Sequence, residues 1–250
     1  MEIIINGLKI NYIVMGEGEP LLILHGWGSC AERWDKITKL IAAGNIKVII
    51  PDLPGFGGSE LPSTAWNLNN YCDFIEQFVI NIPELTKDFY LLGHSFGGAL
   101  ASKFAIKHPQ KIKKLFLVAA ACIRRKTIKK RFLARISKIF KIFSFFPSYD
   151  IIRRAFYKFV VGKSDYLQTN GVMKEAFLRV ISEDLSQHLS FIKVPTVIVW
   201  GDKDSTTLLE DAYFINKKIE NSKLVIIPGA GHDLNWRTPE FLSQEVLKEI

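Results

Sequence analysis

The sequence predicts one α/β domain: a mostly parallel sheet of eight strands, flanked by helices and interrupted by an inserted helical cap. Two observations predict this class. Short apolar runs of strand length alternate with longer segments of helical periodicity. The runs are also almost wholly apolar, which is typical of parallel strands covered on both faces. The expected strands are residues 2–5, 8–14, 21–24, 47–50, 88–92, 113–118, 196–200 and 223–227.

The first two strands are expected to form a hairpin, because Asn6-Gly7 between them suits a two-residue type I′ turn. A turn over residues 16–20 then leads into the third strand. Each later strand is followed by a loop rich in turn residues or by a helical pattern. The expected helices are residues 33–43, 66–80, 99–108, 208–219 and 239–249.

Residues 122–187 interrupt the alternation, because they show helical periodicity only. Apolar residues recur there between basic ones: Ile128, Phe132, Ile136, Phe140 and Phe143. This pattern predicts a core formed by residues 1–121 and 188–250, with residues 122–187 inserted as a helical cap.

The composition is that of an ordinary globular protein with a sizeable core, since 48% of the 250 residues are hydrophobic and 23% are charged. The first residues lack the features of a secretory signal, and no run of about 18 apolar residues is present. Cys30, Cys72 and Cys122 are odd in number and lack metal-type spacing. We therefore expect a cytoplasmic protein with reduced thiols.

The formal net charge of +8 is concentrated in one segment. Residues 123–163 contain thirteen Lys or Arg and one acid, a local charge of +12 that leaves −4 for the remainder. One interpretation is an amphipathic cap whose charged face is merely solvated. The alternatives are that the basic face binds an acidic carrier protein or that it holds the protein on an anionic membrane surface. Nucleic acid is not expected, because no binding motif accompanies the charge.

The segment Gly93-His94-Ser95-Phe96-Gly97 has the pattern Gly-x-Ser-x-Gly between an expected strand and an expected helix. A serine in that context lies on a sharp turn, which small flanking residues permit. Its hydroxyl then projects at the carboxyl edge of the sheet, where the N–H groups of the following helix point towards it. This context predicts that Ser95 is a nucleophile.

A serine needs a base to take its proton, and the base needs an acid to orient it and stabilise its charged form. Asp204 follows the seventh expected strand and His232 follows the eighth, so both reach the same sheet edge as Ser95. We predict His232 as the base and Asp204 as the acid. Asp202, in the same loop, is the alternative acid.

An attacked carbonyl becomes an oxyanion that needs hydrogen-bond donors already in place. The backbone N–H of Phe96, directly after the serine, is one predicted donor. The backbone N–H of Trp27, in the loop after the third strand, is the second.

Five further residues are predicted to shape the substrate site. His25 is expected to order its loop rather than react, and His94 is expected to shape the pocket beside the nucleophile. Three phenylalanines of the expected cap complete the predicted substrate-binding set: Phe132, Phe140 and Phe143. No cluster of His, Cys and carboxylate residues has metal-ligand spacing, so neither a metal nor another cofactor is expected.

The chain resembles the α/β-hydrolase superfamily over roughly residues 1–121 and 188–250. The matching segments occur in family order: His25-Gly26-Trp27-Gly28, Asp52-Leu53-Pro54-Gly55-Phe56-Gly57-Gly58-Ser59, Gly93-His94-Ser95-Phe96-Gly97-Gly98, Trp200-Gly201-Asp202-Lys203-Asp204 and Gly231-His232. The resemblance implies the same nucleophile, base, acid and oxyanion donors as above. It also implies that Asp52 is a structural carboxylate of its loop.

Within that superfamily, a serine at position 95 argues against dehalogenases and epoxide hydrolases, whose nucleophile is aspartate. Hydrolases of carbon–carbon bonds usually carry Asn before the serine and a Ser-Gly-Pro-type oxyanion loop, from which His94 and Trp27-Gly28 depart. The Trp27-Gly28 loop looks more like that of small esterases, including those that cleave pimeloyl methyl esters on acyl carrier protein.

We therefore expect a serine carboxylic ester hydrolase that acts on short- to medium-chain esters through an acyl-enzyme, without a cofactor. Three alternatives remain open at this point. The same triad serves lactone or carbon–carbon bond hydrolysis, and it serves hydrolysis of acyl esters linked to a carrier protein. A ligand receptor that retains the triad but turns over very slowly is the non-enzymatic alternative.

Overall fold

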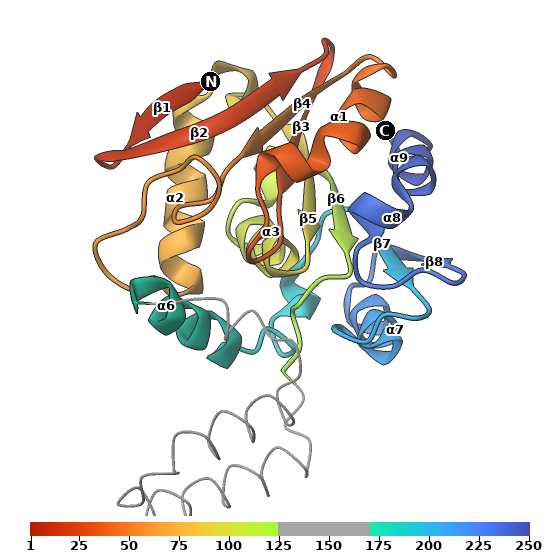
Figure 1. The fold of residues 1–250 in the computed structure, drawn as a ribbon. Coiled ribbons are helices and arrows are strands. Elements are labelled where there is room, and N and C mark those ends of the chain that lie inside the picture. Colours follow the sequence, from red (N-terminus) through yellow and green to blue (C-terminus); the bar gives the residue numbers. More distant parts are fainter. Residues whose placement is uncertain (125–170) are drawn as a thin grey trace, which may run out of the picture.

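The computed structural model describes residues 1–124 and 171–250, whose strands form one eight-stranded sheet in the order β1-β2-β4-β3-β5-β6-β7-β8 (Figure 1). The pairs from β4 through β8 are parallel, whereas β1 with β2 and β2 with β4 are antiparallel. The strands are β1 (Glu2–Ile5), β2 (Leu8–Met15), β3 (Glu19–Leu24), β4 (Ile46–Pro51), β5 (Phe89–His94), β6 (Ile112–Val118), β7 (Thr196–Gly201) and β8 (Ser222–Ile227). The predicted fold class is confirmed.

The hairpin at the start of the chain is confirmed as well. Asn6 and Gly7 have φ angles of 51° and 80°, the left-handed values that a type I′ turn needs at both central positions. The turn pairs Ile5 with Leu8 and places β1 at the outer edge of the sheet.

The strand order decides which face each helix covers. From β3 the chain moves one way across the sheet to β4, and every later crossover moves the other way. With right-handed connections, α1 (Asp35–Ala42) therefore lies on one face, and α2 (Leu68–Asn81), α3 (Phe96–Lys107) and α7 (Leu209–Lys218) lie on the other. The closing helix α9 (Pro239–Leu247) packs against α1, while α2 packs against α3.

Two helix starts differ from the predicted positions. The helix expected at residue 33 begins as a 3-10 turn, η1 (Ala31–Trp34), and becomes α-helical only in α1. Helix α3 starts at Phe96 rather than at residue 99, because two glycines that look like turn residues form its first turn. The remaining short elements are η2 (Pro83–Leu85), η3 (Pro109–Lys111), η6 (Leu189–Phe191) and α8 (Leu234–Arg237).

Of the predicted cap, only the two ends lie within the described residues. The second end contains α6 (Gly171–Ser182), which buries Ala176 and Val180 against the core. Its Arg179 guanidinium donates to the carbonyl oxygen of Ala65 at 2.8 Å. The other cap predictions, including those for Phe132, Phe140, Phe143 and most of the basic segment, fall on residues outside the described part of the chain. The proposed division into core and cap stays a prediction.

Cys30, Cys72 and Cys122 are all free thiols. In residues 1–124 and 171–250, no helix has the length and apolar character needed to cross a bilayer.

Candidate active site

Ser95 occupies a strained turn between β5 and α3. Its φ and ψ angles are 52° and −114°, a combination that L-residues rarely adopt outside functional sites. The turn is held by the backbone, because the Ser95 N–H donates to Val118 at 3.0 Å and its carbonyl accepts from Ala121 at 2.9 Å. The surrounding sheet therefore imposes this conformation on the serine.

Two glycines make the turn possible by letting α3 approach the sheet closely. A Cβ atom at Gly97 would lie 2.0 Å from the carbonyl oxygen of Leu24 in β3, and one at Gly93 would lie 2.3 Å from the carbonyl oxygen of Gly97. Both contacts are with backbone atoms that cannot move aside. The Gly-x-Ser-x-Gly pattern is thus a steric requirement of this packing.

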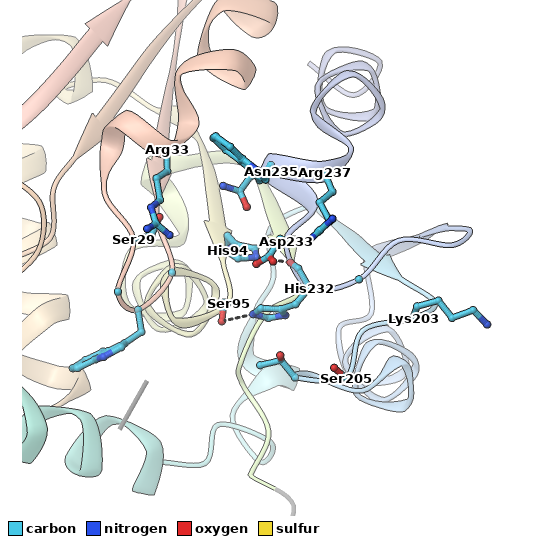
Figure 2. Close-up of a pocket in the computed structure, with 16 residues that line it drawn as sticks. Ser29, Arg33, His94, Ser95, Lys203, Ser205, His232, Asp233, Asn235 and Arg237 are labelled. Carbon is cyan, nitrogen blue, oxygen red and sulfur yellow. Dashed lines mark hydrogen bonds between the residues drawn. The ribbon is translucent and has the colours of Figure 1, made fainter. Parts of the chain in front are cut away.

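The structure brings together the three side chains predicted to react. His232 Nε2 lies 3.0 Å from Ser95 Oγ, as the dashed line in Figure 2 shows, and His232 Nδ1 lies 2.7 Å from Asp204 Oδ2. Ser95 follows β5, Asp204 follows β7 and His232 follows β8, all at the same edge of the sheet. With a proton on Nδ1 directed at Asp204, the Nε2 lone pair faces the serine hydroxyl.

Asp204 is held as an ionised carboxylate. Its Oδ1 accepts from the backbone N–H groups of Thr206 at 2.7 Å and Thr207 at 2.9 Å, and its Oδ2 accepts from Thr207 Oγ1 at 2.8 Å. Burial alone would raise the pKa of Asp204, but the hydrogen bonds from His232 and Thr207 outweigh it and hold that pKa below its ordinary value. The alternative acid, Asp202, accepts from the Gly229 N–H at 2.7 Å instead.

Thr207 is a site residue that the sequence interpretation missed. Besides Asp204, its hydroxyl oxygen lies 3.2 Å from the carbonyl oxygen of Ala119 and 3.3 Å from His232 Nδ1. The available signal was the spacing from Asp204, because an aspartate often accepts from the N–H groups two and three residues later. We infer that Thr207 fixes the carboxylate rather than contacting substrate.

The two predicted oxyanion donors flank the serine. Phe96 is the first residue of α3, so its N–H has no acceptor inside the helix, as the predicted oxyanion role requires. Trp27 lies in the pocket wall, and its ring packs edge-to-face on Phe96 with centroids 5.3 Å apart. The Trp27 ring also contacts Phe56 and, from α6, Phe177. These contacts hold the loop after β3 beside the nucleophile.

His25 orders its loop and does not contact the pocket. It is fully buried, its Nε2 accepts from the Leu53 N–H at 3.0 Å, and its Nδ1 lies 2.8 Å from the carbonyl oxygen of Gly26. Burial lowers the pKa of His25, which keeps the ring neutral. The predicted substrate-binding role of His25 is therefore wrong, because the ring is fully buried, both of its nitrogens are committed to backbone groups, and His25 is absent from the described pocket lining.

His94 lines the pocket and supports the His232 loop. Its Nε2 donates to the backbone carbonyl of His232 at 3.0 Å, and the two ring centroids lie 5.0 Å apart (Figure 2). Burial, followed by the nearby His232 ring, lowers the pKa of His94 to about 3. The ring is therefore a neutral donor that holds the His232 loop in place.

This neutral histidine predicts a pH dependence of stability. The folded pKa lies below the ordinary value of 6.5, so the unfolded chain binds more protons as the pH falls from 6.5 towards 3. The contribution is complete above pH 6.5. We expect this loss of contribution to lower the unfolding free energy of the protein by about 2–3 kcal/mol between pH 7 and 4.5.

Urea denaturation of the wild type and of His94→Gln at these two pH values measures how much His94 contributes to the loss of stability. The variant should lose less stability on acidification than the wild type. His188→Gln is the matched control, because His188 is exposed. Equal acid losses in the wild type and His94→Gln would contradict the account.

A pocket of about 760 Å³ opens beside Ser95 and His232. It is lined by the loops that follow β3, β7 and β8, together with His94 and α8. Within residues 1–124 and 171–250, no group of three or more His, Cys, Asp or Glu side chains is placed to hold a metal ion. Phe132, Phe140 and Phe143, which were also predicted to bind substrate, lie outside the described residues.

A serine in a strained turn after a parallel strand, an imidazole on its hydroxyl and a buried carboxylate on the imidazole define a serine hydrolase of the α/β type. Residues 21–245 match the Alpha/beta hydrolase family, and the chain belongs to that family. The predicted superfamily resemblance is confirmed.

Three relatives show the range of activities in that family. The chain is 26% identical over 242 residues to Lipase 1 of Psychrobacter immobilis, covering 91% of this chain and 76% of the lipase. It is 25% identical over 247 residues to Monoacylglycerol lipase ABHD6 of Homo sapiens, covering 90% and 73%. It is also 26% identical over 248 residues to 2-hydroxy-6-oxo-6-phenylhexa-2,4-dienoate hydrolase of Comamonas testosteroni, covering 91% and 86%.

Solved structures share the fold. A membrane phospholipase A superposes with a TM-score of 0.77 at 22% identity, covering all of this chain and 85% of the phospholipase. A thermophilic esterase from Thermogutta terrifontis superposes with a TM-score of 0.74 at 21% identity, covering 100% and 97%. At these identities the likeness concerns the fold alone.

Proposed function

We propose that this protein is a carboxylic ester hydrolase that acts on short- to medium-chain esters through an acyl-enzyme. The observation that carries the proposal is a pair of linked hydrogen bonds. Ser95 Oγ lies 3.0 Å from His232 Nε2, and His232 Nδ1 lies 2.7 Å from Asp204 Oδ2. Similarity to lipases supports an ester as the substrate.

In the proposed reaction, Ser95 Oγ attacks the ester carbonyl while His232 Nε2 takes the hydroxyl proton. The resulting oxyanion accepts from the backbone N–H groups of Phe96 and Trp27. His232 then gives its proton to the leaving alcohol oxygen, which leaves an acyl group on Ser95. Water attacks the acyl-enzyme by the same steps and releases the acid, while Asp204 stabilises the positively charged imidazole.

A labelling experiment combined with an ester panel tests this function. A fluorophosphonate should modify Ser95, which peptide mass spectrometry identifies. The enzyme should turn over p-nitrophenyl esters steadily, with the highest kcat/KM between acetyl and octanoyl chains. Absence of labelling would contradict the proposed nucleophile, and one burst without turnover would favour the slow-turnover receptor.

Carbon–carbon bond hydrolysis is the second candidate, because the relative from Comamonas testosteroni is named for that activity. The same triad serves that reaction, so substrate comparison must separate the two. A ring-cleavage dienoate absorbs visible light, and its bleaching reports cleavage directly. We expect bleaching to be far slower than ester turnover, since His94 and Trp27-Gly28 depart from the usual pattern of carbon–carbon hydrolases.

A further inference from the structure

The described wall of the pocket is mostly polar. Pockets for small molecules are usually lined by apolar side chains with a few polar groups between them. Here the aromatic members are Trp27 and Trp236, and most of the remaining lining residues are polar, charged or glycine. This part of the pocket therefore suits the polar portion of a substrate better than an acyl chain.

Positive charge dominates this wall. Arg33, Lys203 and Arg237 line the pocket, and Asp233 is the acid among its described lining residues. None of the three cations pairs with a carboxylate within residues 1–124 and 171–250. Neighbouring cations outside the pocket behave differently, since Lys36 pairs with Glu240 and Lys39 pairs with Asp35. The pocket cations are thus free to bind a ligand.

Two of these cations lie on elements that pack against each other. Arg33 belongs to η1 and Arg237 to α8, and these two short helices are in contact. Figure 2 shows Arg33 and Arg237 apart from each other but on the same side of Ser95 and His232, at the end of the pocket that η1 and α8 form. Lys203 lies farther out, on the loop after β7. An anion bound between the two arginines would be adjacent to the reacting groups.

The chemistry of the triad indicates which part of an ester occupies this wall. His232 must give its proton to the leaving oxygen, so the alcohol portion has to lie on the His232 side of Ser95. The loop that continues from His232 supplies Asp233, Trp236 and Arg237 to the same wall. The part of the basic wall that this loop supplies, including Arg237, consequently lies on the side of the departing alcohol, and Arg33 reaches the same end of the pocket from η1, which contacts α8.

We propose that the site prefers esters whose leaving alcohol carries a phosphate or carboxylate, and that Arg33 and Arg237 bind this anion. Arginine suits the role, because its planar guanidinium donates two parallel hydrogen bonds to such groups. Lys203 adds positive potential at the mouth of the pocket and attracts the anionic ester. The inference names a substrate class for the hydrolase proposed above and rests on that function.

Two soluble esters with the same scissile bond test the proposal: 1-butyrylglycerol and 1-butyrylglycerol 3-phosphate. The wild type should show about a tenfold higher kcat/KM for the phosphate ester, as expected for two exposed contacts between arginine and phosphate. In the double variant Arg33→Gln/Arg237→Gln, the ratio of the two kcat/KM values should fall to about one. Equal kcat/KM values for both esters in the wild type would overturn the proposal.

The matched control is Lys36→Gln/Lys39→Gln, which removes two positive charges from the adjacent helix α1 outside the pocket. This control should keep the wild-type ratio. If it lowers the ratio as far as the arginine variant does, general attraction and not a subsite causes the preference, and the proposal fails.

A membrane surface is the other source of phosphate groups near the mouth. Hydrolysis of a long-chain monoacylglycerol is therefore compared in neutral phosphatidylcholine vesicles and in vesicles containing phosphatidylglycerol. If the arginines affect only the anionic vesicles and leave the soluble pair unchanged, they bind a lipid surface and the subsite proposal is overturned.

Binding of glycerol 3-phosphate separates this inference from the proposed activity. Isothermal titration should give a Kd about tenfold weaker in the arginine double variant than in the wild type, whereas glycerol should bind neither protein. If the wild type hydrolyses neither ester but binds glycerol 3-phosphate through the arginines, the proposed function fails and the anion subsite stands. If glycerol 3-phosphate does not bind the wild type, the subsite is refuted.

Discussion

Replacing Ser95 with alanine is expected to lower kcat on a short p-nitrophenyl ester by at least about 10⁴-fold, because no acyl-enzyme forms without the hydroxyl. The His232–Asp204 hydrogen bond does not depend on the serine and should persist. Stopped-assay rates at saturating substrate measure the loss. Ser63→Ala, at an exposed loop position, should retain wild-type kcat.

The same position gives a stability result that separates reactivity from folding. Alanine has the same difficulty as serine at a φ of 52°, so Ser95→Ala should unfold at nearly the wild-type temperature. Glycine adopts this conformation without a penalty, and Ser95→Gly should gain about 1 kcal/mol of unfolding free energy while remaining inactive. A less stable Ser95→Gly would show that the turn is not strained, and full esterase activity in Ser95→Ala would refute the proposed nucleophile.

Replacing Asp204 with asparagine is the second change with a large expected effect, a fall in kcat of about 10³–10⁴-fold. The amide presents no charge to stabilise the positively charged His232, and its NH₂ group favours the wrong histidine tautomer. Thr207→Val should cost less, about tenfold, because it removes only one of the groups that hold the carboxylate.

Asp202→Asn is the matched control for that experiment. It lies two residues away in the same loop and makes the same chemical change, but its carboxylate accepts from Gly229 rather than from His232. Asp202 is half-buried and does not bond to His232, so the kcat of Asp202→Asn should stay within about twofold of the wild type. Similar losses in the two variants would mean that the loop, and not the Asp204 charge, supports catalysis.

Much of the fold was predictable because the parallel strands are buried on both faces. Strands such as β3 and β7 leave a continuous apolar run that needs no knowledge of their partners. The Ser95 turn was predictable for a steric reason, since Gly93 and Gly97 occupy positions where a Cβ atom would collide with backbone. The predicted start of α3 at residue 99 was wrong, because glycine occurs both in turns and in helices. Gly97 and Gly98 look like turn residues in the sequence, but they lie in the first turn of α3.

The site was less predictable where tertiary contacts decide a role. Asp202 and Asp204 share a loop and a residue type, and only the position of His232 distinguishes them. The role of Thr207 depends on Asp204 and Ala119, which the chain separates from it by very different distances. His25 looks like a pocket residue from its place after β3, but it is fully buried and both ring nitrogens are committed to backbone groups of Leu53 and Gly26.

The pocket lining is divided between two kinds of residue. His94 is buried and Ser95 half-buried at the end of β5, whereas Arg33, Ser205 and Arg237 are exposed and lie in loops and short helices that connect the larger elements. Substitutions at accessible positions seldom disturb folding. A saturation library confined to these connections should therefore yield mostly soluble variants, which makes the protein a convenient scaffold for directed evolution of ester selectivity.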